Sequence, residues 1–456
     1  MANPVVRKIG FASLEAIVGL FLLAGVSASV FSLVFLNQSL ALRSELHMQA
    51  VILAQAELEA AKAEIENEFN AVINKTIIKE VFRVNVSAQY INNWSRKVVS
   101  QVFWPQGVTE MFFVYIHKDA FREGDACGLS LKGNWTSPTV LPGQIFLGTG
   151  EKATGIDVKG KFAYITADSS TLQSADFFVV DISVPENPHM VASINTGPGL
   201  GGVKVVGDLA YVVNLSTVSQ LQIINISNPS EPFLVYSYVT GSAASGRSLY
   251  YSNLRIYLGT EISQSREFYI IDVTDPSAPR AEGSFELGTT ANSIKVSGNY
   301  AYVATPSVKQ VWVLNVSDPA NIVEVSNFSP NGSGILHGNA LYLAGDKLYF
   351  GRTGLVAGAY EQLYFFNNLN FMPLLSDFSQ DINTSVNGIF ERSGWIFLAT
   401  NEQDKEFQVW AKNGLVLNFK TALDLHSKAV DFDCEDEKFF VVLEGGNALT
   451  VIKPGS

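Results

Sequence analysis

The apolar positions of the chain follow three successive patterns. An apolar run extends from Ala16 to Leu36, behind the basic residues Arg7 and Lys8. A helix needs about 20 apolar residues to cross a bilayer, and this run is long enough. Apolar residues then recur at three- and four-residue steps, and beyond residue 76 short apolar runs alternate with polar turns. The pattern predicts a long N-terminal helix followed by a mainly β chain.

The predicted helix covers residues 11–75 and has two halves. Residues 11–36 are apolar on every side, as a transmembrane or filament-core segment requires, whereas residues 37–75 are amphipathic. The second half is rich in Ala, Leu, Glu, Lys and Gln, and it contains no Pro or Gly. Its expected apolar face comprises Leu42, Leu46, Val51, Leu53, Leu58, Ala61, Ile65, Phe69 and Ile73. We expect this face to pack on a head domain of the same chain.

A single carboxylate, Glu15, stands at the front edge of the apolar run. A carboxylate within a bilayer is costly, so Glu15 is explained if a neighbouring copy supplies a positive partner. Gly10, Phe11 and Glu15 together resemble the class III signal and N-terminal helix of type IV prepilins. The resemblance implies that residues 1–10 are a leader and that prepilin peptidase cuts after Gly10 and methylates the new amino group. That group would face Glu15 of an adjacent pilin subunit. The alternative is a plain signal anchor, with a basic segment before an apolar one.

A period in the forties runs through the C-terminal two-thirds of the chain. A strand followed by a turn and a proline occurs at 179–185, 223–229, 270–276 and 313–319. A second strand contains an aromatic residue that recurs every 43–48 residues, at Tyr164, Tyr211, Tyr257, Tyr302, Tyr349, Phe397 and Phe440. This period predicts a β-propeller of four-stranded blades. The units resemble LVIVD repeats, clearly in the first four and more weakly in the fifth to seventh. We therefore expect a seven-bladed propeller at 143–456.

The ends of this region predict how the ring closes. The last unit has strands near 429–432, 438–443 and 449–452 but no fourth strand before the chain ends. Residues 143–148 are similar to the fourth strands of other units, and we expect them to complete the last blade. This closure would place Cys127 near the blade that contains Cys434. If the protein is exported, the two can form a disulfide; two free thiols are the alternative.

Residues 76–142 form a β-rich connector and linker between the helix and the repeats. The patterns predict strands at 77–86 and 110–116, leave 98–103 ambiguous, and indicate a linker at 134–138. Pilin heads usually begin with a small antiparallel sheet against the helix. The resemblance therefore implies a shortened sheet of this kind here.

Composition limits the chemistry of the chain. A net charge of −12 argues against nucleic-acid binding, which needs basic patches. The five histidines lack metal-ligand spacing, and no Gly-x-Ser-x-Gly segment is present. The acidic residues at 431–437 alternate with Phe432 and Cys434, which favours a strand with an exposed acidic face over a calcium site. We expect no cofactor, no metal and no enzymatic activity.

One Asn-x-Ser/Thr sequence has an additional acidic residue. Asn383 begins such a sequence, and Asp381 stands two positions before it. Many bacterial glycosylation sites require an acidic residue at that place. Asn383 is therefore a candidate glycosylation site if the protein is exported.

The resemblances lead to one main functional hypothesis. They imply a type IV pilus or pseudopilus subunit, minor or at the tip, that displays a propeller for adhesion or surface recognition. It would lie in the inner membrane before assembly and at the extracellular pilus or cell surface afterwards. Its expected partners are other pilin subunits and a surface glycan or protein. The alternatives are an envelope-anchored binding or scaffolding propeller that does not polymerise and, third, an enzyme on a stalk.

Overall fold

The computed structural model describes residues 41–67, 73–92, 95–105, 107–116, 125–127, 131–168, 171, 173–332, 335–354, 360–367, 369, 373–445 and 447–455. The chain divides into two compact units, residues 1–120 and residues 121–456. Within the described ranges, no helix combines the length and the apolar character that a membrane span requires. The apolar segment predicted at 11–36 lies outside these ranges.

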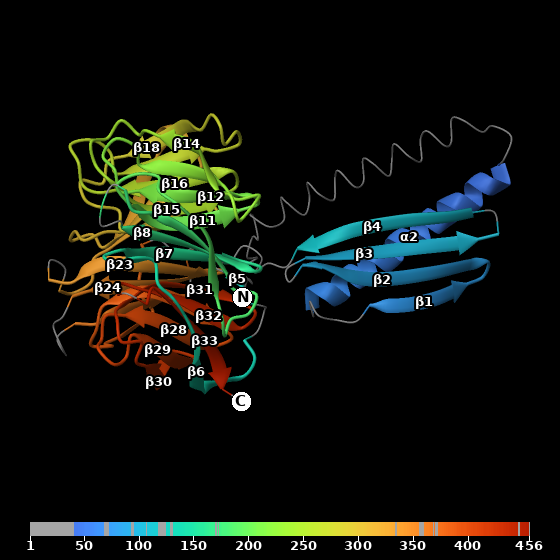
Figure 1. Ribbon diagram of the computed structural model, residues 1–456. Helices are drawn as coiled ribbons and strands as arrows, with labels where there is room; N and C mark the ends of the chain where they lie inside the picture. The colour runs from blue at the N-terminus through green and yellow to red at the C-terminus, as the bar shows by residue number, and fades with distance from the viewer. Residues whose placement is uncertain are drawn as a thin grey trace, which may run out of the picture. The chain divides into compact units, whose positions relative to one another are not determined.

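The first unit packs one helix against one antiparallel sheet (Figure 1). Its elements are α2 (Ala41–Asn67), β1 (Asn74–Lys79), β2 (Phe82–Asn92), β3 (Ser95–Trp104) and β4 (Gly107–Ile116), and the strands lie in this order across the sheet. The buried helix face comprises Ala50, Ala54, Leu58, Ala61 and Ile65, spaced three and four residues apart. It packs against alternate residues of the central strands, Val84, Val86, Val98 and Val102. Of the face expected from the sequence, Leu58, Ala61 and Ile65 lie in this buried stripe, whereas Leu46, Val51 and Leu53 are half-buried and Ile73 lies outside the helix.

The predicted helix extends too far at its C-terminal end. Asn74 and Lys75, assigned to the helix from their composition, begin β1 and pair with Ser87 and Val86 of β2. The β-branched run Thr76-Ile77-Ile78 favours an extended chain, and the sheet supplies its hydrogen bonds. As β1 runs back along α2, Lys75 forms an ion pair with Glu64 and Lys79 forms one with Glu57.

The sheet of the first unit has four strands, where the sequence indicated two and left one segment ambiguous. The predicted strand at 77–86 is a hairpin, because the chain reverses at Glu80 and Val81 between β1 and β2. Glu80 has a φ of 53°, a conformation that glutamate rarely adopts, so the turn was not evident from residue types. The ambiguous segment at 98–103 is strand β3, which pairs with both neighbours.

The described residues of the second unit form seven antiparallel sheets, with a short parallel addition to the last. The first two sheets comprise β7 (Lys152–Lys159), β8 (Phe162–Asp168), β9 (Phe177–Asp181) and β10 (His189–Ile194), then β11 (Leu200–Val206), β12 (Leu209–Asn214), β13 (Leu221–Asn225) and β14 (Phe233–Tyr238). The next two comprise β15 (Gly246–Ser252), β16 (Arg255–Thr260), β17 (Phe268–Asp272) and β18 (Arg280–Phe285), then β19 (Ser293–Ser297), β20 (Tyr300–Ala304), β21 (Val311–Asn315) and β22 (Val323–Phe328), with the 3-10 turn η2 (Pro319–Asn321).

The remaining sheets follow the same order. They comprise β23 (His337–Ala344), β24 (Lys347–Thr353), β25 (Leu363–Phe366) and β26 (Phe378–Gln380), then β27 (Val386–Arg392), β28 (Trp395–Thr400), β29 (Phe407–Asn413) and β30 (Val416–Leu423). The last sheet has five strands in the order β5 (Asp125–Ala126), β31 (Ala429–Glu435), β32 (Lys438–Leu443), β33 (Leu449–Gly455) and β6 (Asn134–Ile145).

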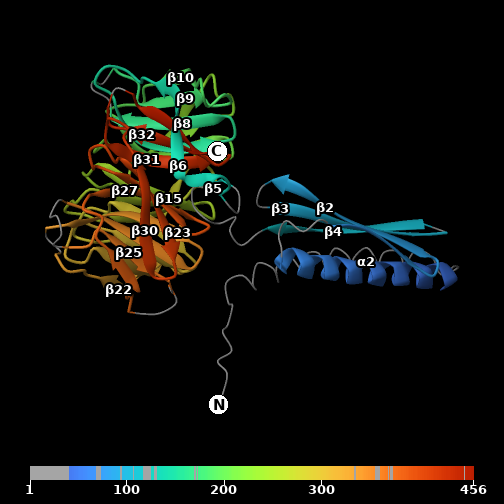
Figure 2. The same ribbon diagram turned by 90° about the horizontal axis from the view of Figure 1, so that it is seen from below.

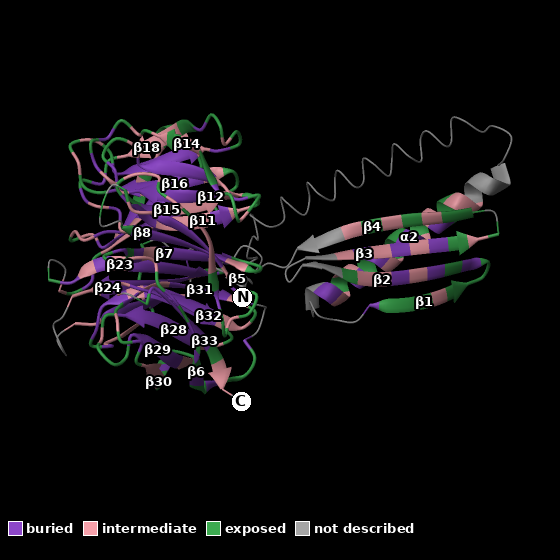
Figure 3. Ribbon diagram, in the orientation of Figure 1, coloured by how far each residue is buried: buried purple, intermediate pink, exposed green. Residues whose placement is uncertain are grey.

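The sheets form a closed ring through their first strands. The strands β7, β11, β15, β19, β23, β27 and β31 contact one another in that order, and β31 returns to β7. Figure 3 shows mostly buried residues along the second strands of the sheets, such as β16 and β28. The core is therefore distributed over the interfaces between adjacent sheets. Five interfaces each have their own apolar cluster, and one further cluster extends through the fifth, sixth and seventh sheets.

The last sheet combines strands from the two ends of the second unit. β6 pairs antiparallel with β33, opposing Leu449 with Ile145 and Gly455 with Asn134. Figure 1 shows β6 beside β33, and Figure 2 shows β5 and β6 close to β31. Residues 134–138, which the sequence indicated as a linker, are strand, and 146–148 lie beyond it. β6 tolerates Pro138 and Pro142 because an outermost strand need not use every backbone N–H.

Trp135 anchors β6 in the interface between the last two sheets. Its side chain is fully buried, and its ring lies edge-on to Phe397 and Phe439, at 4.9 and 5.3 Å between centroids. Phe390, Phe407 and Phe432 also contact Phe439. β6 thus closes the ring by both strand pairing and aromatic packing.

The repeated turn motif is a hydrogen-bonding device. Asp181, Asn225, Asp272 and Asn315 end their strands, and each accepts a hydrogen bond from the backbone N–H two residues later, at 2.8–3.0 Å. This is the Asx-turn geometry that Asp and Asn favour. The motif residues therefore stabilise the chain reversal before the fourth strand.

A second repeated device was not apparent from the sequence. A buried acidic or amide residue immediately precedes the third strand of the first six sheets: Asp176, Gln220, Glu267, Gln310, Gln362 and Glu406. Most of these side chains accept backbone N–H groups from the connection to the next sheet, as Asp176 does from Thr196 at 2.8 Å. They satisfy buried backbone groups that the strands leave unpaired.

Replacing Trp135 tests its contribution to ring closure. We expect Trp135→Ala to destabilise the second unit by about 3–5 kcal/mol, because it empties an enclosed aromatic site. Trp135→Phe should cost less. Chemical denaturation of both variants measures the difference, and equal stability of Trp135→Ala and the parent would contradict this role.

Asp176 predicts a pH dependence of stability. Burial raises the pKa of Asp176 to about 6 from an ordinary value of 3.8. The folded chain therefore keeps a proton that the unfolded chain releases, and stability should fall as pH rises from 3.8 to 6.

Asp176→Asn should remove this part of the pH dependence and preserve the fold, because Gln serves at the equivalent place in three other sheets. The measurement is the unfolding midpoint between pH 4 and 7, with the exposed Asp168→Asn as control. An unchanged pH profile for Asp176→Asn would refute the assignment.

Candidate functional site

The structure describes one of the two sets of residues that the sequence singled out, the cysteines, and does not describe the other. Gly10, Phe11 and Glu15 lie outside the described residues. Cys127 and Cys434 form a disulfide, with a Cα–Cα distance of 5.3 Å. Both cysteines are fully buried, and the adjacent strands β5 and β31 pair in parallel. The segment 125–145 therefore joins the last sheet at both edges, through β5 on the inside and β6 on the outside.

The acidic residues of β31 do not form the exposed face that the sequence suggested. Asp433 is buried, and its carboxylate accepts the backbone N–H of Val158 on β7 at 2.7 Å. Asp431 accepts from Ile156 at 3.4 Å, and Glu435 accepts from Gly160. These three side chains follow the free edge of the first sheet. Their carboxylates join that edge to the last sheet by hydrogen bonds. The alternation of acidic and apolar residues along the sequence does not reveal this contact, because β7 is distant in the chain.

The interface between the last and first sheets contains several buried or half-buried carboxylates close to one another. Asp157 on β7 bonds the ammonium of Lys204 on β11 at 2.9 Å and accepts the backbone N–H of Val205. Burial, reinforced by the negative charge of Asp157, raises the pKa of Asp433 well above its usual range. Burial, followed by Asp436, raises the pKa of Glu435 to about 7. Among the described residues, no group of three or more His, Cys, Asp or Glu side chains is arranged to hold a metal. We therefore interpret the cluster as a structural junction.

Asn383 lies in the connection after β26. The residue is exposed and has a φ of 57°. Its backbone N–H donates to Asp381 at 2.9 Å and to Gln362 at 3.0 Å. Ser385, the third residue of the sequence, is buried, and its hydroxyl accepts from Gly354. Glycosylation at Asn383 therefore stays a prediction, on an exposed side chain in a hydrogen-bonded turn.

A polar cavity lies at the interface of the fifth and sixth sheets. Its volume is about 430 Å³, within the range of small-molecule sites. Its charged lining residues are Lys347 on β24, Glu391 on β27 and Lys412 on β29, and Tyr349 and Asn367 add polar groups. Gly394 and Gly414 adopt positive φ in the turns at its edge. The spacing of these residues along the sequence gives no indication of a shared cavity.

Lys412 is held against aromatic rings. Its ammonium lies 5.1 Å from the centroid of Tyr349 and 5.1 Å from that of Phe365, and 3.3 Å from the Tyr349 hydroxyl. Burial, with the nearby charge of Lys347, lowers the pKa of Lys412. The negative charges of Glu391 and Asp377 act in the opposite direction and partly offset this lowering.

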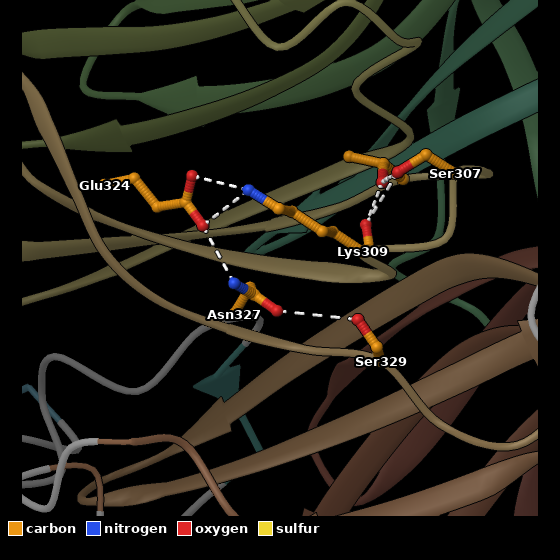
Figure 4. Close-up of polar contacts among 6 residues, drawn as sticks. Ser307, Lys309, Glu324, Asn327 and Ser329 are labelled. Atoms are coloured by element: carbon orange, nitrogen blue, oxygen red, sulfur yellow. Dashed lines mark hydrogen bonds and ion pairs between the residues drawn. The ribbon is translucent and has the colours of Figure 1, made fainter.

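Lys309 in the fourth sheet shows the contrasting arrangement (Figure 4). Its ammonium lies 4.2 Å from the centroid of Trp312, but Glu324 neutralises it at 2.8 Å. Asn327 donates to the same carboxylate at 2.9 Å. The charge of Lys309 is therefore satisfied within its own sheet. The charge of Lys412 faces a cavity that it shares with a second lysine.

Comparison with known proteins supports the fold. Residues 150–196, 201–240, 262–286 and 288–329 match the LVIVD repeat. The WD40 β-propeller domain of Doa1 has a TM-score of 0.51 at 11% identity, covering 70% of this chain and 97% of that chain. Residues 121–456 form a β-propeller that contains LVIVD repeats.

Two other propeller structures are similar with lower scores. A quinoprotein alcohol dehydrogenase-like protein from Bacteroides thetaiotaomicron has a TM-score of 0.45 at 12% identity, covering 78% of this chain and 92% of that chain. BamB from Moraxella catarrhalis has a TM-score of 0.42 at 12% identity, covering 83% and 94%. No curated protein matches the chain.

Removing the disulfide tests how much the bond between Cys127 and Cys434 stabilises the last sheet of the propeller. We expect the double variant Cys127→Ala/Cys434→Ala to lose about 2–5 kcal/mol of stability, because the bond restricts the unfolded chain over a long loop. Reduction of the parent protein should give the same loss. The check is denaturation with and without thiol reductant, and identical curves would count against a stabilising disulfide.

Proposed function

We propose that this chain is a type IV pilin-like subunit that displays a non-catalytic propeller for surface recognition. The observation that carries the proposal is the first unit, in which α2 packs one stripe on a four-stranded antiparallel sheet. This unit follows directly on the apolar segment that bears Gly10, Phe11 and Glu15. A helix that leads from an apolar segment onto such a sheet is the arrangement that the pilin resemblance implies.

The exposed side of α2 adds support. Met48 and Ile52, four residues apart, are 50% and 60% exposed. Residues at this spacing lie on the same side of a helix, here away from the buried stripe. In a filament, aliphatic groups on this side can pack against a neighbouring helix. A helix used only as a spacer has no need of them.

The propeller fits a recognition role. We take its seven sheets as seven blades, which makes it much larger than the helix-and-sheet unit. This size favours a minor or tip position over one at every step of a filament. Three successive blades also expose an aliphatic side chain in the loop before the third strand: Val218, Ile262 and Val308, at 74%, 61% and 65% exposure. Exposed apolar groups on adjacent loops are suited to contact with a partner.

The disulfide supports an extracytoplasmic location for the propeller. A bond between Cys127 and Cys434 persists in an oxidising compartment and is rare in the cytosol. We therefore propose that the chain lies in the inner membrane before assembly, and that the propeller reaches the cell surface on a pilus or pseudopilus. Prepilin peptidase and other pilin subunits are its proposed partners.

Glu15→Ala tests the filament role. We expect the variant to be made and cleaved after Gly10, yet to lose incorporation into filaments by at least about tenfold, because the new amino terminus loses its carboxylate partner. The measurements are mass spectrometry of the mature N-terminus and immunoblotting of sheared filaments. Glu59→Ala, at an exposed position on α2, is the matched control.

The outcomes separate the proposal from its main alternative. A chain that keeps its initiator methionine and is absent from filaments would be an anchored propeller that does not polymerise. Normal incorporation of Glu15→Ala would also refute the proposed role of the carboxylate. Electron microscopy with labelled propellers then distinguishes a tip position from a shaft position.

A further inference from the structure

The cavity between the fifth and sixth sheets lies where the repeat normally places apolar residues. In four earlier sheets, the residue after the third strand donates its backbone N–H to the turn between the first two strands: Ile182, Ile226, Val273 and Val316. All four are buried. Lys412 makes the same backbone bond, to Gly394. A lysine therefore occupies a position that is aliphatic in these repeats.

Glu391 shows a second replacement beside the first. It pairs with Ile396, the second residue of its neighbouring strand. The equivalent residues of the first five sheets are Val158, Val205, Tyr251, Val296 and Leu343, and four of these are buried aliphatic residues. Two positions that fill the interface elsewhere are thus charged here. These replacements coincide with the 430 Å³ cavity.

The carboxylate of Glu391 has a local structural role, because it accepts the backbone N–H of Gly394 at 3.3 Å. The charge of Lys412 is less well explained by stability. Isoleucine or valine packs against the preceding sheet in the equivalent interfaces, as Ile226 does in the cluster with Tyr164 and Val179. A half-buried ammonium in the same place loses hydration; it gains the aromatic faces of Tyr349 and Phe365, the Tyr349 hydroxyl at 3.3 Å and the attraction of Glu391 and Asp377. Lys347 adds a second positive charge to the cavity. Glu391 and Asp377 offset part of this positive charge, and a bound carboxylate would offset more of it.

We propose that this cavity binds the acidic sugar unit of a carboxylated saccharide. The sugar carboxylate would lie between Lys347 and Lys412, and Glu391 and Asn367 would accept and donate hydrogen bonds to its hydroxyl groups. The cavity is lined by five polar side chains, which suits a sugar better than an apolar ligand. The inference rests on the proposed recognition function, for which it names the ligand class.

The test uses the full chain purified in detergent and a defined uronic acid oligomer, trigalacturonate, with the neutral galactose trimer for comparison. Isothermal titration should show binding of the uronate only. Lys412→Met should weaken this binding at least about tenfold and leave the unfolding midpoint unchanged or higher, because it restores an apolar side chain. Lys420→Met, at an exposed position on β30 of the same sheet, should bind as the parent does.

Competition experiments with small anions distinguish recognition of an acidic sugar from binding of any anion. Acetate and inorganic phosphate, each at the concentration of the uronate, should compete weakly or not at all. Equal binding of acetate, phosphate or the neutral trimer would overturn the assignment to an acidic sugar. Undiminished uronate binding by Lys412→Met, or absence of uronate binding by the parent, would overturn the site itself.

The same variants distinguish this inference from the proposed function. Lys412→Met should enter filaments normally, because it lies in the propeller, and Glu15→Ala should bind trigalacturonate normally. If the parent chain enters filaments but does not bind uronate, only the proposed sugar site is refuted. Failure of the Glu15 test with intact uronate binding would remove only the pilin-like role.

Discussion

The pairing of β6 with β33 closes the ring of sheets, and every interface in the second unit depends on that closure. An open ring would expose the apolar sides of its first and last sheets. The closing residues come from opposite ends of the unit, and the disulfide that secures them joins positions 307 residues apart. The cost of closing so long a loop is met by strand pairing, the packing of Trp135, the carboxylates of β31 and the covalent bond together.

Within the ring, side chains of each sheet satisfy backbone groups of the next. Asn292, Asn339 and Asn387 recur at intervals of about one repeat, and their amides donate to Gly338, Val386 and Ala429 on the following sheets, at 2.6–2.9 Å. The carboxylates of β31 serve the same purpose where the ring closes. Polar residues at the ring axis are therefore compatible with burial, because each meets an edge that lacks a partner strand.

This construction explains how the repeats can specialise. The buried residues before the third strands of the first six sheets, and the Asx turns of the first four, fix the backbone of a blade independently of what fills the interface beside it. The backbone N–H of Lys412 donates to the turn between the first two strands, as in its aliphatic equivalents. Its side chain lines the charged cavity, where the equivalents make apolar contacts. A repeat can thus change its chemistry at one interface without losing its place in the ring.

The sequence by itself determined the repeat period, the mainly β fold and the amphipathic stripe of α2, because spacing along the chain directly reflects strand and helix geometry. It also indicated that an early segment must complete the last sheet. It placed the helix end, the strand at Asn134 and the burial of Asp433 incorrectly, since each depends on a partner distant in the sequence. The cavity was decided only by the tertiary structure: Lys347, Glu391 and Lys412 belong to different strands, and only the packing of two sheets brings their charges together.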